Sequence, residues 1–214
     1  MTPAAPAPQE SLAQLLGGRR GALDATLPPV AFVAGYLAGG QSIGIGVAAA
    51  LAVSVAVGAW RLSQGDRLRA VVVGLLGVAL AAYIALRTGR AADFFVVRIA
   101  VNALSGMAWV ASIAVRRPLL GVVVGLVLGQ KAGWRKDRAL LRAYALGSWV
   151  WVLQYVVRVA VLLPLWYADQ VVALGVAQTV LTWPLVLACL AASWWVVRRA
   201  LPPGHPGLRH PVVA

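Results

Sequence analysis

The sequence has few of the residues on which most enzyme chemistry depends. Its 214 residues include one cysteine, two histidines and six acidic residues. The single cysteine excludes an internal disulfide, and both histidines lie in the Pro/Gly-rich tail. The acidic residues form no paired-carboxylate motif, and the chain has no Gly-Lys-Ser/Thr phosphate loop. Catalysis that needs a metal, a carboxylate pair or an activated serine is therefore disfavoured, and we predict no metal and no cofactor.

Charge is also scarce, and it is strongly unbalanced. Hydrophobic residues make up 61% of the chain and charged residues 12%. This fraction of charged residues is too small to cover the surface of a soluble globular protein. Nineteen basic residues against six acidic ones give a net charge of +13. In a soluble protein this balance would indicate nucleic acid, but the apolar excess argues against that partner and for a lipid bilayer.

Long apolar stretches predict an all-α polytopic membrane bundle. A spanning helix needs roughly 20 mostly apolar residues, and six stretches meet or approach that length. They are residues 22–39, 42–60, 68–86, 93–115, 143–166 and 170–197. A seventh stretch, 118–129, would extend only about 18 Å as a helix and is predicted to be re-entrant or interfacial. Pro28-Pro29 and Trp183-Pro184 are expected to break or kink their helices.

The distribution of basic residues predicts the orientation. If 118–129 does not cross, 15 basic residues lie on one side, two lie in the opposite loops, and Arg98 and Arg158 lie within spans. The positive-inside rule then places both termini in the cytoplasm of an inner-membrane protein. The predicted divisions are a disordered cytoplasmic tail (1–18), a six-span domain (19–199) and a Pro/Gly-rich cytoplasmic tail (200–214). The basic loop 131–142, with Trp134 at its centre, is expected to lie on anionic lipid head groups.

Polar residues within the spans are the candidate functional residues, because they are costly in lipid. Helical spacing aligns Arg98 and Asn102 on the fourth span, and Gln154 and Arg158 on the fifth. Gln178 lies on a similar stripe of the sixth span. These stripes predict a shared pocket, and a buried arginine would suit a phosphate or carboxylate. The alternative for Arg98 is contact with lipid head groups or with Asp93.

Small residues recur at helical spacing in several places. Gly121, Gly125 and Gly129 leave one face of the short stretch without side chains. Such a face allows close helix packing, which we expect here, or it lines a cavity in a re-entrant element. Gly74 and Gly77 are interpreted as packing residues only.

Several segments resemble a known family. The segments GGRRGALDATLPPVAF, RRPLLGVVVGLVLG and WRKDRALLRAYALGSWVWVLQYVVRVAVLLPLW resemble the actinobacterial integral-membrane family called domain of unknown function 3159, over roughly residues 17–199. A more distant similarity is to the inner-membrane septation protein A family. It rests on an aspartate before an early proline, on Trp60-Arg61, on Arg117-Pro118 and on Trp134-Arg135.

Two functional hypotheses follow. The first is a non-enzymatic multi-pass inner-membrane protein, associated with the envelope or with cell division as the septation resemblance implies. It would act through helix and lipid contacts, with a membrane-protein partner or as a homo-oligomer. The alternative is a small transporter or permease for an anionic solute or lipid. An enzyme acting on a lipid-soluble substrate is disfavoured by the missing carboxylates.

Overall fold

The computed structural model describes residues 18–129 and 133–202, and within these ranges the chain is helical with no strand. The predicted all-α class is therefore confirmed. The tails predicted at 1–18 and 200–214 lie almost wholly outside the described residues. The elements are α2 (Gly18–Ala38), α3 (Ile43–Ser63), α4 (Leu68–Thr88), η1 (Ala91–Phe95), α5 (Val96–Ala114), α6 (Leu119–Val127), η2 (Gly133–Arg135), α7 (Arg138–Tyr167), α8 (Val171–Val180) and α9 (Trp183–Ala200).

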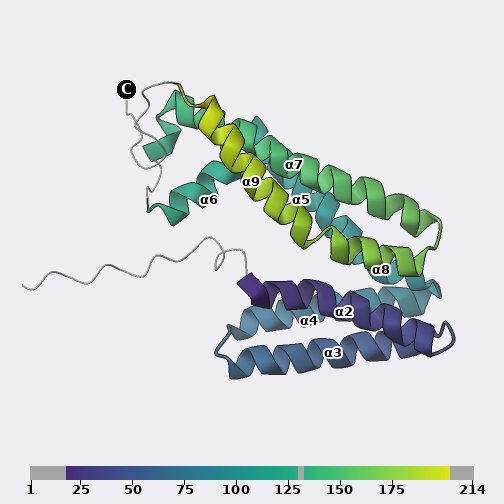
Figure 1. Ribbon diagram of the computed structural model, residues 1–214. Helices are drawn as coiled ribbons and strands as arrows, with labels where there is room; N and C mark the ends of the chain where they lie inside the picture. The colour runs from purple at the N-terminus through teal and green to yellow at the C-terminus, as the bar shows by residue number, and fades with distance from the viewer. Residues whose placement is uncertain (1–17, 130–132, 203–214) are drawn as a thin grey trace, which may run out of the picture.

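The long helices run between two ends of the molecule (Figure 1). We call the end with the turns after α2, α4 and α7 the joined end, and the end with the turns after α3 and α5 the basic end. Five helical segments are long and apolar enough to cross a membrane: Ile43–Ser63, Leu68–Thr88, Ala91–Ala114, Arg138–Tyr167 and Val171–Ala200. In α2, a shorter apolar part covers Thr26–Ala38.

The helices form two groups. The N-terminal group contains α2, α3 and α4, while the C-terminal group contains α5 to α9. Helix α2 packs along α3, and α7 packs between α5 and α9. Figure 1 shows the ribbons of the two groups close together at the joined end and diverging toward the basic end. Helix α8 contacts α2, so it connects the two groups.

Most of the buried apolar residues belong to one of two separate cores. At the joined end, Phe32 of α2 stacks on Phe94 of η1 with ring centroids 4.0 Å apart, and Leu174 of α8 belongs to the same core. This core draws residues from both groups. At the basic end, Trp134 and Tyr144 form the centre of a second core whose buried members all come from η2, α7 and α9. Of the two cores in the described part of the chain, only the first therefore contains residues of both groups.

The last predicted span, 170–197, is broken in the structure. Helix α8 ends at Val180 and α9 begins at Trp183, with Pro184 in the first turn of α9. Proline has no N–H to continue the α8 hydrogen-bond ladder, which explains the break. The break lets α8 lean on α2 while α9 follows α7. Pro28 and Pro29, in contrast, lie within the continuous helix α2.

Part of the predicted basic loop 131–142 is helical, with η2 before Asp137 and α7 after it. Trp134 is 1% exposed and packs edge-on against Tyr144. Helix α7 starts at Arg138, five residues before the predicted start of its span. Asp137 caps it by accepting hydrogen bonds from the backbone N–H groups of Ala139 and Leu140 at 3.0 and 3.1 Å.

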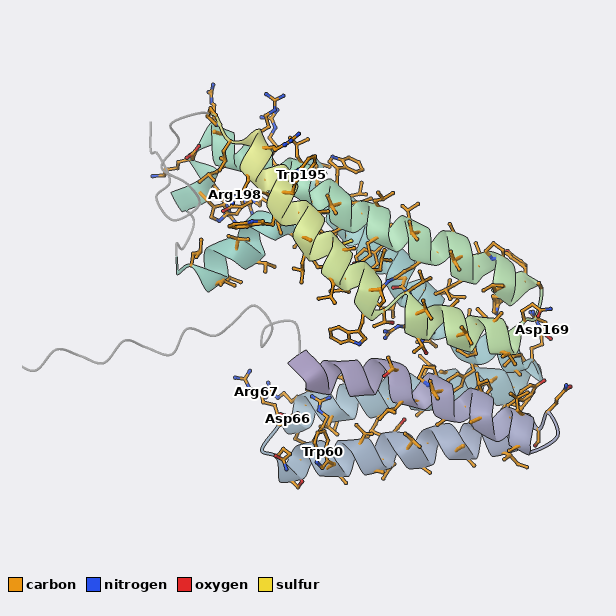
Figure 2. The ribbon with its side chains drawn as sticks, viewed as in Figure 1. Trp60, Asp66, Arg67, Asp169, Trp195 and Arg198 are labelled. Atoms are coloured by element: carbon orange, nitrogen blue, oxygen red, sulfur yellow. The ribbon has the colours of Figure 1, made fainter. Side chains whose placement is uncertain are left out.

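Aromatic and arginine side chains gather at the two ends of the bundle. Figure 2 shows Trp60, Arg67, Trp195 and Arg198 at the basic end and Asp169 at the joined end. At the basic end, arginines lie over exposed tryptophans; Arg199, for example, is 4.5 Å from the ring centroid of Trp195. Such aromatic belts are typical of the two membrane–water interfaces.

Candidate functional site

A cavity of about 460 Å³ lies between the two helix groups. Its walls come from α2 and α4 on one side and from η1, α5 and α8 on the other. Arg98 of α5 and Gln178 of α8 are its two polar side chains, and the remaining lining residues are apolar or glycine. The volume is within the range of about 300–1,000 Å³ typical of small-molecule sites.

Arg98 is half-buried on this cavity without a counter-ion. No hydrogen bond or ion pair joins it to any residue within the described ranges 26–129 and 134–202. The carboxylate of Asp93 is occupied elsewhere, because Trp166 donates its indole N–H to it at 2.7 Å and Arg90 lies 3.7 Å away. The predicted alternative of an Arg98 contact with Asp93 is therefore not the arrangement found.

Arg158, the other arginine within a span, points to backbone rather than to the cavity. Its guanidinium donates to the carbonyl oxygens of Leu181 and Thr182 at 3.1 and 3.2 Å, and to Asn102 Oδ1 at 3.5 Å. These two carbonyls lie at the break between α8 and α9. A cation is favourable at the C-terminus of a helix, and here it also supplies donors to carbonyls that the broken ladder exposes. Arg158 therefore stabilises the bend.

The five predicted pocket residues are thus divided between different places. Arg98 and Gln178 line the cavity between the groups. Arg158 of α7 instead donates a hydrogen bond to Asn102 of α5. Asn102 also lines a separate, almost wholly apolar groove between α5 and α7. Gln154 is 2% exposed, and its side-chain oxygen has no partner among the described residues. The oxygen of Gln178 likewise has no partner in that part of the chain.

The glycines fall into two kinds that the sequence does not distinguish. A Cβ on Gly121 or Gly125 would come within 2.9 Å of Trp134, so these positions allow α6 to pack closely. Gly129 lies beyond the end of α6, in a left-handed turn with φ +65°. Gly74 and Gly77, interpreted above as packing residues, would place a Cβ in open space and line the cavity instead.

A polar network at the joined end is not predicted by any motif in the sequence. Arg90 donates to the carbonyl oxygen of Trp166 at 3.2 Å, lies over its ring, and is 3.8 Å from Asp169. Together with the Asp93–Trp166 hydrogen bond, this ties η1 to the end of α7. The bonded partners are more than 70 residues apart in the chain, and the only sequence signal is that all four lie within three residues of the end of a predicted span.

The fold and the site define the class as an all-helical protein with helices apolar enough to span a membrane. Within the described residues, no group of three histidine, cysteine or acidic side chains is placed to hold a metal. The chain belongs to the DUF3159 family of proteins of unknown function, whose family model matches residues 16–204. No match to this chain is found among curated proteins or among solved structures.

Proposed function

We propose that the chain is a six-span inner-membrane protein that binds and carries a small anionic solute or lipid through the cavity between its two helix groups. The single observation that carries this proposal is Arg98, a cation within a span that faces a cavity and has no partner among the described residues. An unpaired charge in a membrane interior is costly, and such residues mark substrate pathways in many membrane proteins.

The proposed topology counts α2 as the sixth span, with both termini in the cytoplasm. Helix α2 has 21 residues and runs between the same two ends as α3 and α4. Arginines at the turns after α3 and α5 and at the end of α9 make one end basic, which the positive-inside rule assigns to the cytoplasm. Reporter fusions at Asp137 and at His205 should both report cytoplasm. An external signal at Asp137 would contradict this topology.

The envelope or septation scaffold remains the competing proposal, in which helix and lipid contacts alone carry the function. The two differ in what the cavity contributes. A scaffold does not need an arginine without a counter-ion at a cavity, nor glycines that face open space. A carrier needs both a charge that binds its anionic substrate and a free volume that holds it. The arrangement of Arg98, Gly74 and Gly77 therefore favours the carrier.

A deletion strain complemented with variants tests the function. The strain is scored for cell shape and for lipid and metabolite content, with Arg98→Gln as the main variant. Arg87→Gln is the matched control. Arg87 is an exposed arginine in the last turn of α4 and does not line the cavity. We expect Arg98→Gln to reproduce the metabolic change of the deletion and Arg87→Gln to restore the wild type. A change in cell shape alone, restored equally by both variants, would favour the scaffold.

A further inference from the structure

The walls of the cavity restrict the class of ligand. Eleven of its thirteen lining residues are apolar or glycine, and the exceptions are Arg98 and Gln178. A hydrated inorganic anion would exchange part of its water for walls that offer it only two polar side chains, which is unfavourable. An anion that carries its own apolar surface avoids this cost, because its apolar part replaces water along the apolar walls.

The shape of the cavity provides room for that apolar part. Gly74 and Gly77 leave two positions of the α4 wall without a side chain, and an added Cβ at either position would meet no atom within 4 Å. Phe94 and Phe95 form the wall near the joined end. A volume of about 460 Å³ is that of a site for one small molecule, so it suits a single chain rather than the two chains of a membrane phospholipid.

The charge of the site determines the head group. Arg98 has no counter-ion among residues 26–129 and 134–202. The nearest acidic residues on either side of Arg98 in the sequence have partners elsewhere. Asp66, in the turn before α4, lies 2.7 Å from Arg61, and Asp93 of η1 accepts a hydrogen bond from Trp166. A carboxylate or phosphate would supply the missing negative charge and accept the planar donors of the guanidinium.

We propose that the ligand of this cavity is an amphiphile with one anionic head group, a carboxylate or a phosphate, and a single apolar chain. The head group binds Arg98 and Gln178, and the chain lies along the Gly74 and Gly77 wall. This inference rests on the proposed function and narrows its substrate to one chemical class.

Equilibrium binding to the full chain in phosphatidylcholine nanodiscs tests the proposal. The probes are decanoate and decyl phosphate, which separate the two head groups, with decyltrimethylammonium as the cationic counterpart and inorganic phosphate as the head group without a chain. Empty nanodiscs correct for partition into the lipid. Each variant is first checked for a monodisperse size-exclusion profile and for its thermal midpoint.

Two pairs of variants test separately the charge of Arg98 and the free volume of the cavity. Arg98→Gln removes the charge, with Arg87→Gln as its control. Gly77→Leu fills the cavity, with Gly44→Leu as its control, because a Cβ on Gly44 meets only Ser42 Oγ, at 3.8 Å, and lies on α3 away from the cavity. If Arg98→Gln does not fold, Gly77→Leu tests the site by itself.

We expect saturable binding of at least one anionic probe to the wild type. Arg98→Gln should weaken it about tenfold or more, the factor that a hydrogen bond to a charged group contributes. Gly77→Leu should abolish it, and both controls should bind as the wild type does. Equal binding of decyltrimethylammonium, or wild-type binding by Gly77→Leu, would overturn the proposal. Arg98-dependent binding of inorganic phosphate without binding of the chain-bearing probes would overturn it but leave the carrier standing. If no anion binds in an Arg98-dependent way, both proposals fail.

Discussion

The two ends of the molecule are built differently. At the joined end, one core takes residues from α2, α3, α4, η1, α5, α7 and α8, and the polar network of Arg90, Asp93 and Trp166 closes it. At the basic end, the buried core belongs to the C-terminal group alone. In lipid, helices gain little from apolar burial and associate through close packing and hydrogen bonds. The contacts that determine how the two groups sit are therefore concentrated at one end, and the cavity lies beside them.

The largest effect is expected from Phe32→Ala. Phe32 is fully buried and touches Phe94 and Phe95 across the two groups, so its removal leaves a void in the shared core. We expect a loss of about 3–5 kcal/mol in the free energy of unfolding. Thermal unfolding in nanodiscs measures the loss.

Trp134→Ala is the matched comparison, because Trp134 is equally buried but lies in the core of one group. Spin labels at Leu68→Cys and Trp194→Cys, both exposed in the wild type, report the distance between the groups in a Cys189→Ser background. Phe32→Ala should broaden this distance distribution, whereas Trp134→Ala should leave it unchanged. Equal broadening by both variants would show that the ends do not differ as described.

Arg158→Leu should have the next largest effect. It removes the donors to Leu181 and Thr182 and leaves two carbonyls without partners at the bend. At about 1–3 kcal/mol for a buried polar group left unpaired, we expect a loss of about 2–4 kcal/mol in the free energy of unfolding. Arg158→Lys keeps the charge and a donor and should lose less than half of that. If the leucine variant is as stable as the wild type, Arg158 does not hold the bend.

Gly125→Val tests the packing of α6 at the basic end. Its Cβ would come within 2.7 Å of the Trp134 indole nitrogen, so Trp134 must move. We expect a loss of about 1–3 kcal/mol. Gly77→Ala is the control. It should lower the free energy of unfolding by less than Gly125→Val does, because a Cβ at position 77 meets no atom within 4 Å. Thermal midpoints of the two variants give the comparison, and an equal loss in both would contradict the difference between the two kinds of glycine.

The smallest effect is expected from Asp93→Asn. The amide oxygen can still accept the Trp166 indole hydrogen bond, while the attraction to Arg90 at 3.7 Å is lost. We expect a loss of about 1 kcal/mol or less, since the Arg90 side chain is 41% exposed and solvent weakens the attraction. Asp93→Ala, which leaves the indole N–H unpaired, should lose more. Thermal unfolding of both variants shows whether the Asp93–Trp166 hydrogen bond or the Asp93–Arg90 ion pair contributes more to stability at the joined end.

Local patterns in the sequence were enough to predict the helices but not where each one breaks. The apolar runs predicted the class because helix length and hydropathy are properties of neighbouring residues. The predicted bounds of 118–129 match those of α6 to within two residues at each end. The basic residues on both sides of this short apolar run leave few alternative positions for the helix ends. The burial of Trp134 was not predicted, because a tryptophan among basic residues has the same local pattern whether it is exposed or packs against Gly121 and Gly125.

The candidate site shows the same division. Helical spacing brought Arg98, Asn102, Gln154, Arg158 and Gln178 to notice, because a polar residue in a span is conspicuous in any sequence. Spacing along one helix says nothing about which neighbour that helix meets. Two arginines that looked alike in the sequence therefore have different surroundings: Arg158 meets the carbonyls of a bend in another span, and Arg98 meets a cavity.

By itself, the sequence determined that this protein is a basic, all-helical chain with helices apolar enough to cross a membrane, and it belongs to the family that its motifs indicated. These properties depend on composition and on residues close together in the chain. The tertiary structure alone decided that Gly77 faces open space, that Asp93 is bonded to Trp166 and that Arg98 has no partner among the described residues. Each of these depends on residues far apart in the sequence, whose meeting is set by how the two helix groups pack.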